Sequence, residues 1–331
     1  MPTKAILFRA DNSGRVTALL ALILGTAILF PSPAPANTTE NQITSDANGT
    51  ASITGTTNWT PATTIAPTNV LASTYDYTTA TTLRTPAIQN SYTVNADSLT
   101  LNSGGSLGFK GSNVLTIPNL VLNGGKIANS ATSGNPDMAR LAGTINLTAN
   151  SSIAPNGAAT SLVNILAQIT NSGASTPTVT VSGGGTVILS AQNTFSGNVT
   201  VNNTTPNAIL KLGANNAVPA TAIVQLNAGN NPSAIFDLNG FNTTVAGVNP
   251  TSGTVTGFVT NSAAATTSTL TISNNTSFMM NNGIVADNPG TAGTIALAFT
   301  GSGTVTLNSA DTYHGSTTVS SGTWHWAELV P

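Results

Sequence analysis

The residues that could support acid–base chemistry are few and widely spaced. Asp237, Asp287 and Asp311 lie in the second half of the chain, each at least 24 residues from the next. Sugar hydrolysis requires a pair of carboxylates, and polysaccharide lyases and hydrolases combine such clusters with Lys or Arg. No Lys or Arg follows Lys211. The spacing and the missing cations therefore argue against such an enzyme, although folding could still bring distant carboxylates together.

The chain has two histidines, His314 and His325, and Asp311 lies three residues before His314. One hypothesis makes Asp311 the carboxylate that orients His314 as a general base. The alternative places Asp311 at a turn-favouring position with His314 as a variable neighbour. We favour the alternative and predict no catalytic residues.

Metal and cofactor sites are not predicted either. Two histidines and no cysteine give no convincing set of metal ligands. The glycine-rich segment Gly183-Gly184-Gly185-Thr186 lacks the Asp of the calcium-binding nonapeptide. It is not followed by the Lys-Ser or Lys-Thr of a phosphate loop. We therefore expect no metal-binding residues, no cofactor-binding residues and no cofactor.

The composition excludes several classes of protein. Of 331 residues, 8 are Lys or Arg and 10 are Asp or Glu, so 5% are charged, against about 25% in ordinary globular proteins. A net charge of -2 without a basic run excludes nucleic-acid binding. The chain is 40% hydrophobic with a mean hydropathy of +0.15, which favours a folded protein over a disordered one. Without cysteine there are no disulfides.

Residues 1–36 have the features of a cleaved signal peptide. Lys4, Arg9 and Arg15 precede an apolar run from Val16 to Phe30, and Ala34-Pro35-Ala36 matches the A-x-A cleavage pattern. The run is shorter than the roughly 20 residues that span a bilayer. We expect cleavage after Ala36, export to the cell surface or the medium, and no stable membrane span afterwards. The alternative is an uncleaved membrane anchor.

Short stretches of alternating apolar and polar residues fill the rest of the chain. They end at Gly, Asn or Pro and have the period of two that is typical of strands. Examples are Ser98–Leu101, Val114–Ile117, Ile145–Thr148, Val179–Val181 and Leu270–Ile272. The one plausible helical stretch, residues 161–169, is short. The pattern predicts an all-β protein.

Internal repeats indicate which all-β architecture to expect. Residues 183–203 and 301–321 align without a gap, with nine of 21 positions identical. Val187 and Leu189 recur as Val305 and Leu307 while their neighbours vary, so these apolar residues should point into a core. A weaker copy pairs the stretches that begin at Leu99 and Leu120, which are 21 residues apart.

A repeat of about 20 to 25 residues cannot bury its apolar face alone, so we expect the repeats to stack. A parallel β-helix with roughly 22 residues per coil is the predicted architecture. Stacking places like residues above one another, which suits Thr, Val and Asn and disfavours charges. A β-sandwich is the alternative, but it would not explain gap-free repetition at the length of a coil.

Residues 301–323, with the letters GSGTVTLNSADTYHGSTTVSSGT, resemble the autotransporter-associated β-strand repeat family. Residues 183–201 match less completely, and residues 236–247, FDLNGFNTTVAG, also look like these proteins. The resemblance is specific over about residues 180–324 and looser from about residue 57. It implies a right-handed parallel β-helix, an Asn-type turn position at Asp311, and a role in exporting the passenger chain.

The end of the sequence departs from the family pattern. Eight residues follow Thr323, which leaves no room for the translocator barrel of an autotransporter. Trp324 stands where the family usually has Leu. A truncated or frame-shifted gene, a secreted member without a barrel, and capping of the last coil by Trp324 and Trp326 are the three interpretations.

The predicted organisation has four parts. These are a signal peptide (1–36), a Thr-rich segment and cap (37–90), the β-helix (91–324) and an atypical tail (325–331). Tyr75, Tyr77 and Tyr92 lie in or beside the cap, where we expect them to pack together rather than bind sugar. We expect a non-enzymatic exported scaffold or adhesin, with secretion machinery or cell-surface components as partners. The alternative is a carbohydrate-active β-helix enzyme.

Overall fold

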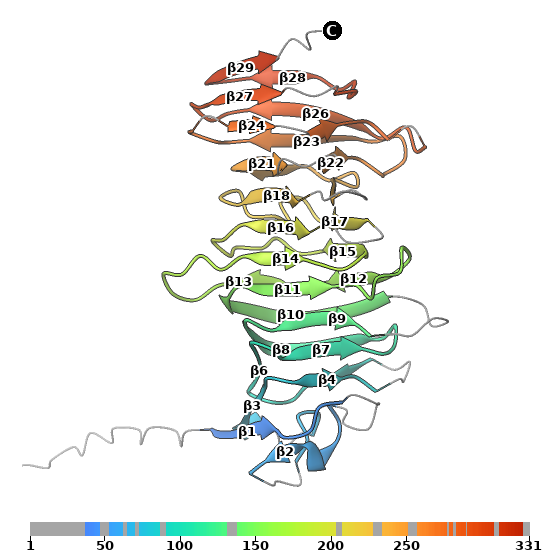
Figure 1. Ribbon diagram of the computed structural model, residues 1–331, viewed down its shortest axis with the longest axis vertical. Helices are drawn as coiled ribbons and strands as arrows, with labels where there is room; N and C mark the ends of the chain where they lie inside the picture. The colour runs from blue at the N-terminus through green and yellow to red at the C-terminus, as the bar shows by residue number, and fades with distance from the viewer. Residues whose placement is uncertain are drawn as a thin grey trace, which may run out of the picture. The chain divides into compact units, whose positions relative to one another are not determined.

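The computed structural model describes most of the chain after residue 36. It covers residues 37–46, 53–61, 65–69, 73–86, 91–130, 138–202, 207–227, 234–250, 257–276, 278–280, 283–288, 290–307 and 311–326. In these residues short parallel strands stack coil on coil into a β-solenoid (Figure 1). The prediction of an all-β parallel β-helix is therefore confirmed. The predicted signal peptide, residues 1–36, and the last five residues of the predicted tail lie outside the described residues.

Two long sheets contain most of the described strands, and in each sheet the strands of successive coils pair with one another. The first sheet contains β1 (Thr38–Gln42), β2 (Trp59–Thr60), β3 (Tyr75–Thr79), β5 (Tyr92–Thr93), β6 (Ser98–Asn102), β8 (Val114–Asn123), β10 (Met138–Ala149), β12 (Leu162–Ile165), β13 (Gln168–Thr170), β15 (Gly185–Leu189), β17 (Ala208–Leu212), β19 (Ala234–Asp237), β22 (Gly257–Thr260) and β25 (Gly283–Val285). The second contains β4 (Thr82–Arg84), β7 (Ser106–Phe109), β9 (Lys126–Asn129), β11 (Ser151–Ala154), β14 (Val179–Val181), β16 (Val199–Asn202), β18 (Ile223–Asn227) and β21 (Gly247–Pro250).

Two smaller sheets continue the stack towards the C-terminal side. One contains β20 (Thr243–Val245), β23 (Thr267–Ile272), β26 (Thr294–Phe299) and β28 (Thr317–Val319). The other contains β24 (Phe278–Met280), β27 (Thr304–Leu307) and β29 (Thr323–Trp326). A single turn of 3-10 helix, η1 (Thr56–Asn58), precedes β2. Within the described residues, no helix is both long and apolar enough to cross a membrane.

The register of the strands follows the repeats found in the sequence. Leu99 of β6 pairs directly with Leu120 of β8, as their spacing of 21 residues predicts. Side chains that bond between neighbouring coils are typically 21 to 28 residues apart. All described strand pairs are parallel except β1 with β2. The alternative of a β-sandwich is therefore wrong.

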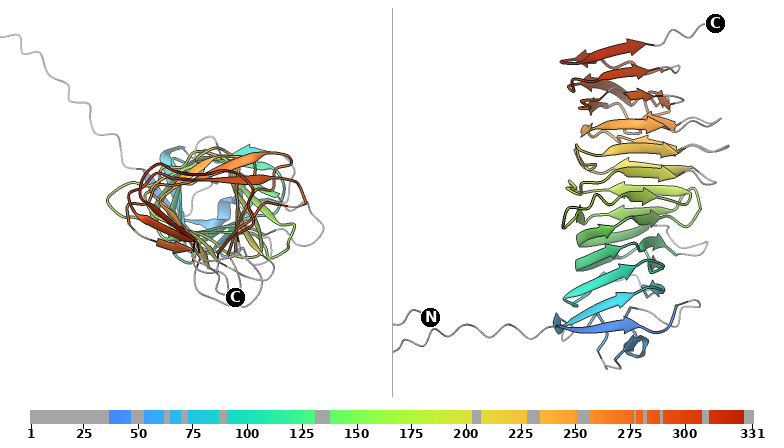
Figure 2. Two further views of the ribbon diagram at one scale, coloured as in Figure 1. Left: turned by 90° about the horizontal axis from the view of Figure 1, so that it is seen from above. Right: turned by 60° about the vertical axis from the view of Figure 1, so that its left-hand side comes forward.

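The core lies inside the coils, where alternate residues of each strand point. Val187 and Leu189 are buried, as are their counterparts Val305 and Leu307, so the prediction that these positions face inward is confirmed. Viewed along the stack, the strands of successive coils overlie one another around this interior (Figure 2). Residues 161–169, the one plausible helical stretch, instead form β12 and β13 because their buried residues alternate with exposed ones.

Outside the core, uncharged side chains form hydrogen-bonded ladders across the coils. Asn102 Nδ2 donates to Thr78 Oγ1 (2.6 Å), and Asn123 Nδ2 donates to Asn102 Oδ1 (2.9 Å). Thr148 Oγ1 donates to Asn123 Oδ1 (3.3 Å) and extends this ladder to a fourth coil. The same type of residue can repeat in a column because neighbouring amides and hydroxyls satisfy one another, whereas like charges would repel.

Aromatic side chains pack at both ends of the described stack. Near the N-terminal end, Trp59 meets Tyr77 edge to face (centroids 4.8 Å apart) and Tyr75 lies 6.3 Å from Tyr77. Tyr77 is buried, and its contact with Tyr75 agrees with the expectation for these two residues; the expected packing of Tyr92 with them stays a prediction. Near the C-terminal end, Trp324 pairs with Val305 in the register and packs edge to face on Phe299 (4.7 Å). This packing fits the capping interpretation of Trp324.

Candidate functional site

The strongest candidate site lies where the coil after β25 meets the segment that leads into β28. Asp287 follows β25, and an isolated parallel bridge between Ala286 and Thr312 joins the two segments beside it. His314 is two residues beyond that bridge. Next to Asp287, an antiparallel bridge joins Asn288 to Gly293. The stacking of coils therefore brings Asp287 next to His314, although 27 residues separate them.

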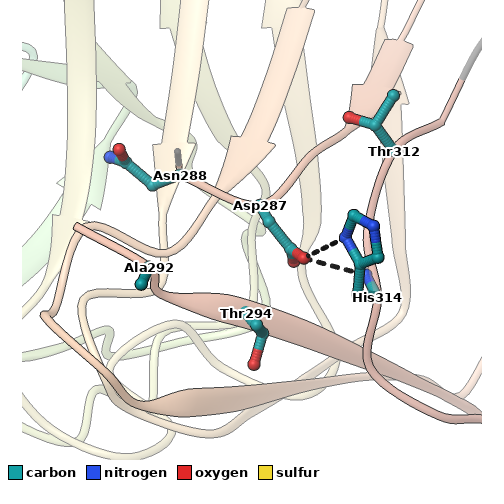
Figure 3. Close-up of a pocket in the computed structure, with 6 residues that line it drawn as sticks. All are labelled: Asp287, Asn288, Ala292, Thr294, Thr312 and His314. Atoms are coloured by element: carbon teal, nitrogen blue, oxygen red, sulfur yellow. Dashed lines mark hydrogen bonds and ion pairs between the residues drawn. The ribbon is translucent and has the colours of Figure 1, made fainter. Parts of the chain in front are cut away.

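Both oxygens of the Asp287 carboxylate form hydrogen bonds. Oδ1 accepts the backbone N–H of Ile295 (2.8 Å), and Oδ2 accepts the backbone N–H of His314 (2.9 Å). Oδ2 also lies 2.8 Å from His314 Nδ1, and Figure 3 shows both of its contacts with His314. The Asp287 side chain is 14% exposed and the His314 side chain 82% exposed. The carboxylate is thus fixed by the backbone and holds the imidazole at the surface.

The pair lines a pocket of about 490 Å³ that is mainly apolar. Asn288, Ala292, Thr294 and Thr312 form the rest of the lining (Figure 3). In the neutral tautomer that carries its hydrogen on Nδ1, His314 would donate to Asp287 and leave a lone pair on Nε2, which is the arrangement of a general base. Asp287 is the one carboxylate among the lining residues, so the lining does not supply the two carboxylates of a glycoside hydrolase.

The sequence-based pairing of Asp311 with His314 is not found. Asp311 Oδ1 instead accepts the backbone N–H of Val285 on the preceding coil (2.6 Å). Its Oδ2 is buried and has no hydrogen-bond partner among the described residues, and burial raises the pKa of this carboxyl to about 6. The orienting carboxylate is Asp287, which sequence spacing alone did not suggest. The coil length was the signal that could have found it, because one coil before His314 is the neighbourhood of residue 287.

Asp311 has the structural role of an asparagine, as the favoured interpretation proposed. Its counterpart in the repeat alignment is Asn193, whose Oδ1 accepts the backbone N–H of Ile169 (2.7 Å). Asn193 Nδ2 then donates to the carbonyl of Ala217 on the following coil (2.6 Å). Both residues thus bind the backbone of the preceding coil. Asp311 cannot make the second bond of Asn193 because a carboxylate has no N–H to donate.

Asp237 and Lys211 form a second charged cluster, spread over three coils. Asp237 is 6% exposed, and its Oδ2 lies 3.2 Å from Lys211 Nζ. The same oxygen accepts the Ser262 hydroxyl (2.6 Å), and Oδ1 accepts the backbone N–H groups of Ser262 and Asn239 (2.9 Å each). Lys211 also donates to Ser262 Oγ (2.8 Å). An ammonium that is held by a carboxylate cannot act as a base towards Ser262, so this cluster ties coils together rather than activating a nucleophile.

Close packing against the previous coil explains the glycines at the corner that leads into β15. Gly183 and Gly185 have φ of +81° and +116°. A Cβ on Gly183 would lie 2.6 Å from the carbonyl oxygen of Pro155, and one on Gly185 would lie 2.5 Å from that of Ser161. Glycine is therefore required both by the backbone conformation and by the closeness of the previous coil.

One buried carboxyl was missed by the sequence analysis. Glu40 of β1 pairs in the register with Tyr77 and is buried, and neither of its oxygens has a hydrogen-bond partner in the part of the chain that the structure describes. Burial raises the pKa of Glu40. The alternation of β1, in which Glu40 takes an inward position, was the available signal. The neutral carboxyl is the form that this environment favours.

The remaining candidate residues do not join these clusters. His325 lies on β29, is exposed, and pairs in the register with Thr306. Across the described part of the chain, no group of three or more His, Cys, Asp or Glu residues is arranged to hold a metal ion. The described charged groups therefore form separate small clusters on different coils.

Comparisons with known proteins give no relative for this chain: no protein-family model, no curated protein and no solved structure matches it.

Proposed function

We propose that the protein is a non-enzymatic, exported β-helical scaffold of the autotransporter-passenger type, which acts at the cell surface or in the medium and supports secretion of its own chain. The observation that carries this proposal is that uncharged side chains join the stacked coils to one another. Coils 21 to 28 residues long are joined by in-register ladders of Asn, Thr and Ser. The resemblance of residues 301–323 to the autotransporter-associated repeats supports the same function.

This architecture suits a chain that folds after it has crossed a membrane. Each coil gains its hydrogen bonds from the coil before it, so stacking can proceed by local contacts. The chain contains no cysteine, so folding does not wait for disulfide exchange. Few ion pairs need to form, because 5% of the residues are charged. Secretion machinery and cell-surface components are the partners that we infer.

The leader offers a direct test of export. Arginine in place of Leu22, at the centre of the apolar run, should stop export and leave the chain unprocessed, because a charge opposes insertion of the signal core. Leu22→Ile keeps the apolar character and is the matched control. Fractionation of the native cell, followed by immunoblotting, measures the location of each variant. Export of Leu22→Arg at the level of Leu22→Ile would refute the role of residues 1–36.

A carbohydrate-active enzyme is the second candidate, and the Asp287–His314 pair is the observation that favours it. An oriented imidazole at the edge of a pocket is the one arrangement among the described residues that resembles an acid–base centre. The test is hydrolysis or lyase activity on a panel of neutral and acidic polysaccharides, followed by release of reducing ends or unsaturated products. We expect no turnover. Activity that His314→Ala abolishes, with unchanged thermal unfolding, would establish the enzyme instead.

A further inference from the structure

A second pocket lies on the second long sheet, the one that contains β9, β11 and β14, and its lining includes a lysine. It also measures about 490 Å³, which lies within the range of roughly 300–1,000 Å³ of small-ligand sites. Three successive coils contribute to it through β9, β11 and the corner after β14. The lining consists of Lys126, Ala128, Asn129, Ser130, Ala154, Pro155, Asn156, Gly157, Ser182, Gly183 and Gly184.

Lys126 is the charged group of this pocket. No Asp or Glu is among the lining residues, so the lining carries a formal charge of one positive unit in a chain whose net charge is -2. The other two lysines of the described residues are held by carboxylates, Lys110 by Asp46 and Lys211 by Asp237. Lys126 makes no such ion pair with the described residues, and its register neighbours are Ser106 and Ser152. The Lys126 side chain is exposed, so an anion in solution can reach its ammonium.

The rest of the lining offers hydrogen bonds and a small apolar surface. The hydroxyls of Ser130 and Ser182 have no hydrogen-bond partner among the described residues, and both side chains are partly exposed. Ala128, Ala154 and Pro155 supply apolar contact. Two contacts join neighbouring coils at this corner: Gly183 lies against the carbonyl of Pro155, and the Gly157 N–H donates to the carbonyl of Gly184 (3.1 Å). The pocket is thus largely formed before a ligand arrives, which lowers the entropy cost of binding.

From these features we propose that the Lys126 pocket binds a sugar that carries a carboxylate, such as a uronate unit of an acidic polysaccharide. One ammonium matches the single negative charge of one carboxylate, whereas a phosphate monoester carries close to two negative charges at neutral pH. The serine hydroxyls match the hydroxyls of a sugar ring, and the apolar strip matches its C–H face. The proposal goes beyond the scaffold function and does not depend on where the protein is located.

Calorimetric titration of the purified chain at low salt tests the site. The probe is trigalacturonate, and maltotriose is the neutral sugar of equal length. Trigalacturonate should bind, maltotriose should bind at least tenfold more weakly, and Lys126→Gln should weaken trigalacturonate binding by at least tenfold. Arg140→Gln removes one positive charge from β10 of the first long sheet, outside the pocket, and should leave binding unchanged. Lys126→Arg should retain most of the affinity.

Several results would overturn the proposal. One is that the wild-type protein does not bind trigalacturonate at millimolar concentration. Another is that Lys126→Gln and Arg140→Gln lose binding to the same extent. Equal binding of inorganic phosphate or triglutamate would overturn the assignment to a sugar. Thermal unfolding of each variant shows whether it is folded. Ser182→Ala, which removes a pocket hydroxyl and no charge, provides a second variant that should weaken binding of the trisaccharide.

Discussion

At the scale of single residues, the hydrogen bonds of a polar side chain in this fold depend on the coils before and after it. Asn193 bonds in both directions, whereas Asp311 bonds to the preceding coil and its buried Oδ2 has no partner among the described residues. An inward position suits Val187, but at Glu40 it leaves a buried carboxyl to which no described residue donates a hydrogen bond. Charge is therefore costly here even where an uncharged polar side chain of the same shape fits well.

The first prediction concerns the pH dependence of Asp311. Its folded pKa of about 6 lies above the ordinary value of 3.8. The carboxyl is protonated in both states below about pH 4, and stability is lost as the pH rises towards 6, because the unfolded chain ionises more easily. This loss of the free energy of unfolding should amount to about 1 kcal/mol after allowance for solvent screening, and it should be absent in Asp311→Asn. Urea unfolding of both proteins from pH 3.5 to 8 measures it.

The shape of this pH profile is the decisive readout, because the amide introduced by Asp311→Asn also brings an N–H group without a known acceptor. Asp97→Asn, which removes an exposed carboxylate, is the control for the loss of one charge. The difference between wild type and Asp311→Asn should grow between pH 4 and 6 and then level off. A constant difference over the whole range would contradict the raised pKa.

The second prediction tests the inward direction of the repeat valines. Val187→Asp and Val305→Asp should each lower the free energy of unfolding by more than about 3 kcal/mol, because they bury an unpaired charge. Thr186→Asp and Thr304→Asp place the same charge one position away, on the partly exposed side, and should cost less than about 1 kcal/mol. Thermal and denaturant unfolding measure all four. Equal losses at neighbouring positions would argue against the alternation.

At the scale of elements, the corners set how closely successive coils can approach. Gly157 and Gly183 both have positive φ, but they differ in their surroundings. A Cβ on Gly157 would have no atom within 4 Å, whereas one on Gly183 would lie 2.6 Å from the Pro155 carbonyl oxygen. The two positions therefore separate the cost of backbone conformation from the cost of contact with the previous coil.

This contrast yields the third prediction. Gly157→Ala should cost about 1 kcal/mol, because alanine is disfavoured in a left-handed conformation. Gly183→Ala should cost at least about 2 kcal/mol more, because the Pro155 carbonyl would have to move. Denaturant unfolding gives both values. Similar losses in the two variants would show that the corner before β15 can widen freely.

Elements were predictable from the sequence wherever the alternation was strong. The strands around Leu99, Val114, Ile145 and Leu270 are found where the period of two placed them. Residues 161–169 were ambiguous because SLVNILAQI can be read with either period, and only the pairing of β12 and β13 with β10 decides between them. The Asp287–His314 contact was not predictable from local spacing, because it depends on the length of one particular coil.

At the scale of the whole molecule, the described strands behave as a one-dimensional stack. In the second long sheet the register runs without interruption from Thr82 through Ser106, Lys126 and Ser152 to Thr180, and then through Thr200 to Gln225. Neighbouring strands lie about 4.8 Å apart. The distance between two outward residues should thus increase in equal steps with the number of coils between them.

The fourth prediction uses this regular spacing. Cysteines at Thr82 and Thr180, four strand steps apart, should place spin labels about 19 Å apart, and a pair at Thr82 and Gln225, six steps apart, should give about 29 Å. The chain has no cysteine of its own, so labelling is specific. Double electron–electron resonance measures both distances. The increment of about 10 Å is independent of the label linkers, and a markedly different increment would contradict the stack.

Export of the chain is the central claim about function, and the N-terminus of the native protein tests it most directly. The measurement is fractionation of the native cell with mass spectrometry of the N-terminal peptide. We expect the protein to be found outside the cytoplasm, with a chain that begins at Asn37 after removal of residues 1–36. A cytoplasmic protein that retains Lys4, Arg9 and the apolar run from Val16 to Phe30 would show that the chain is not exported in this way.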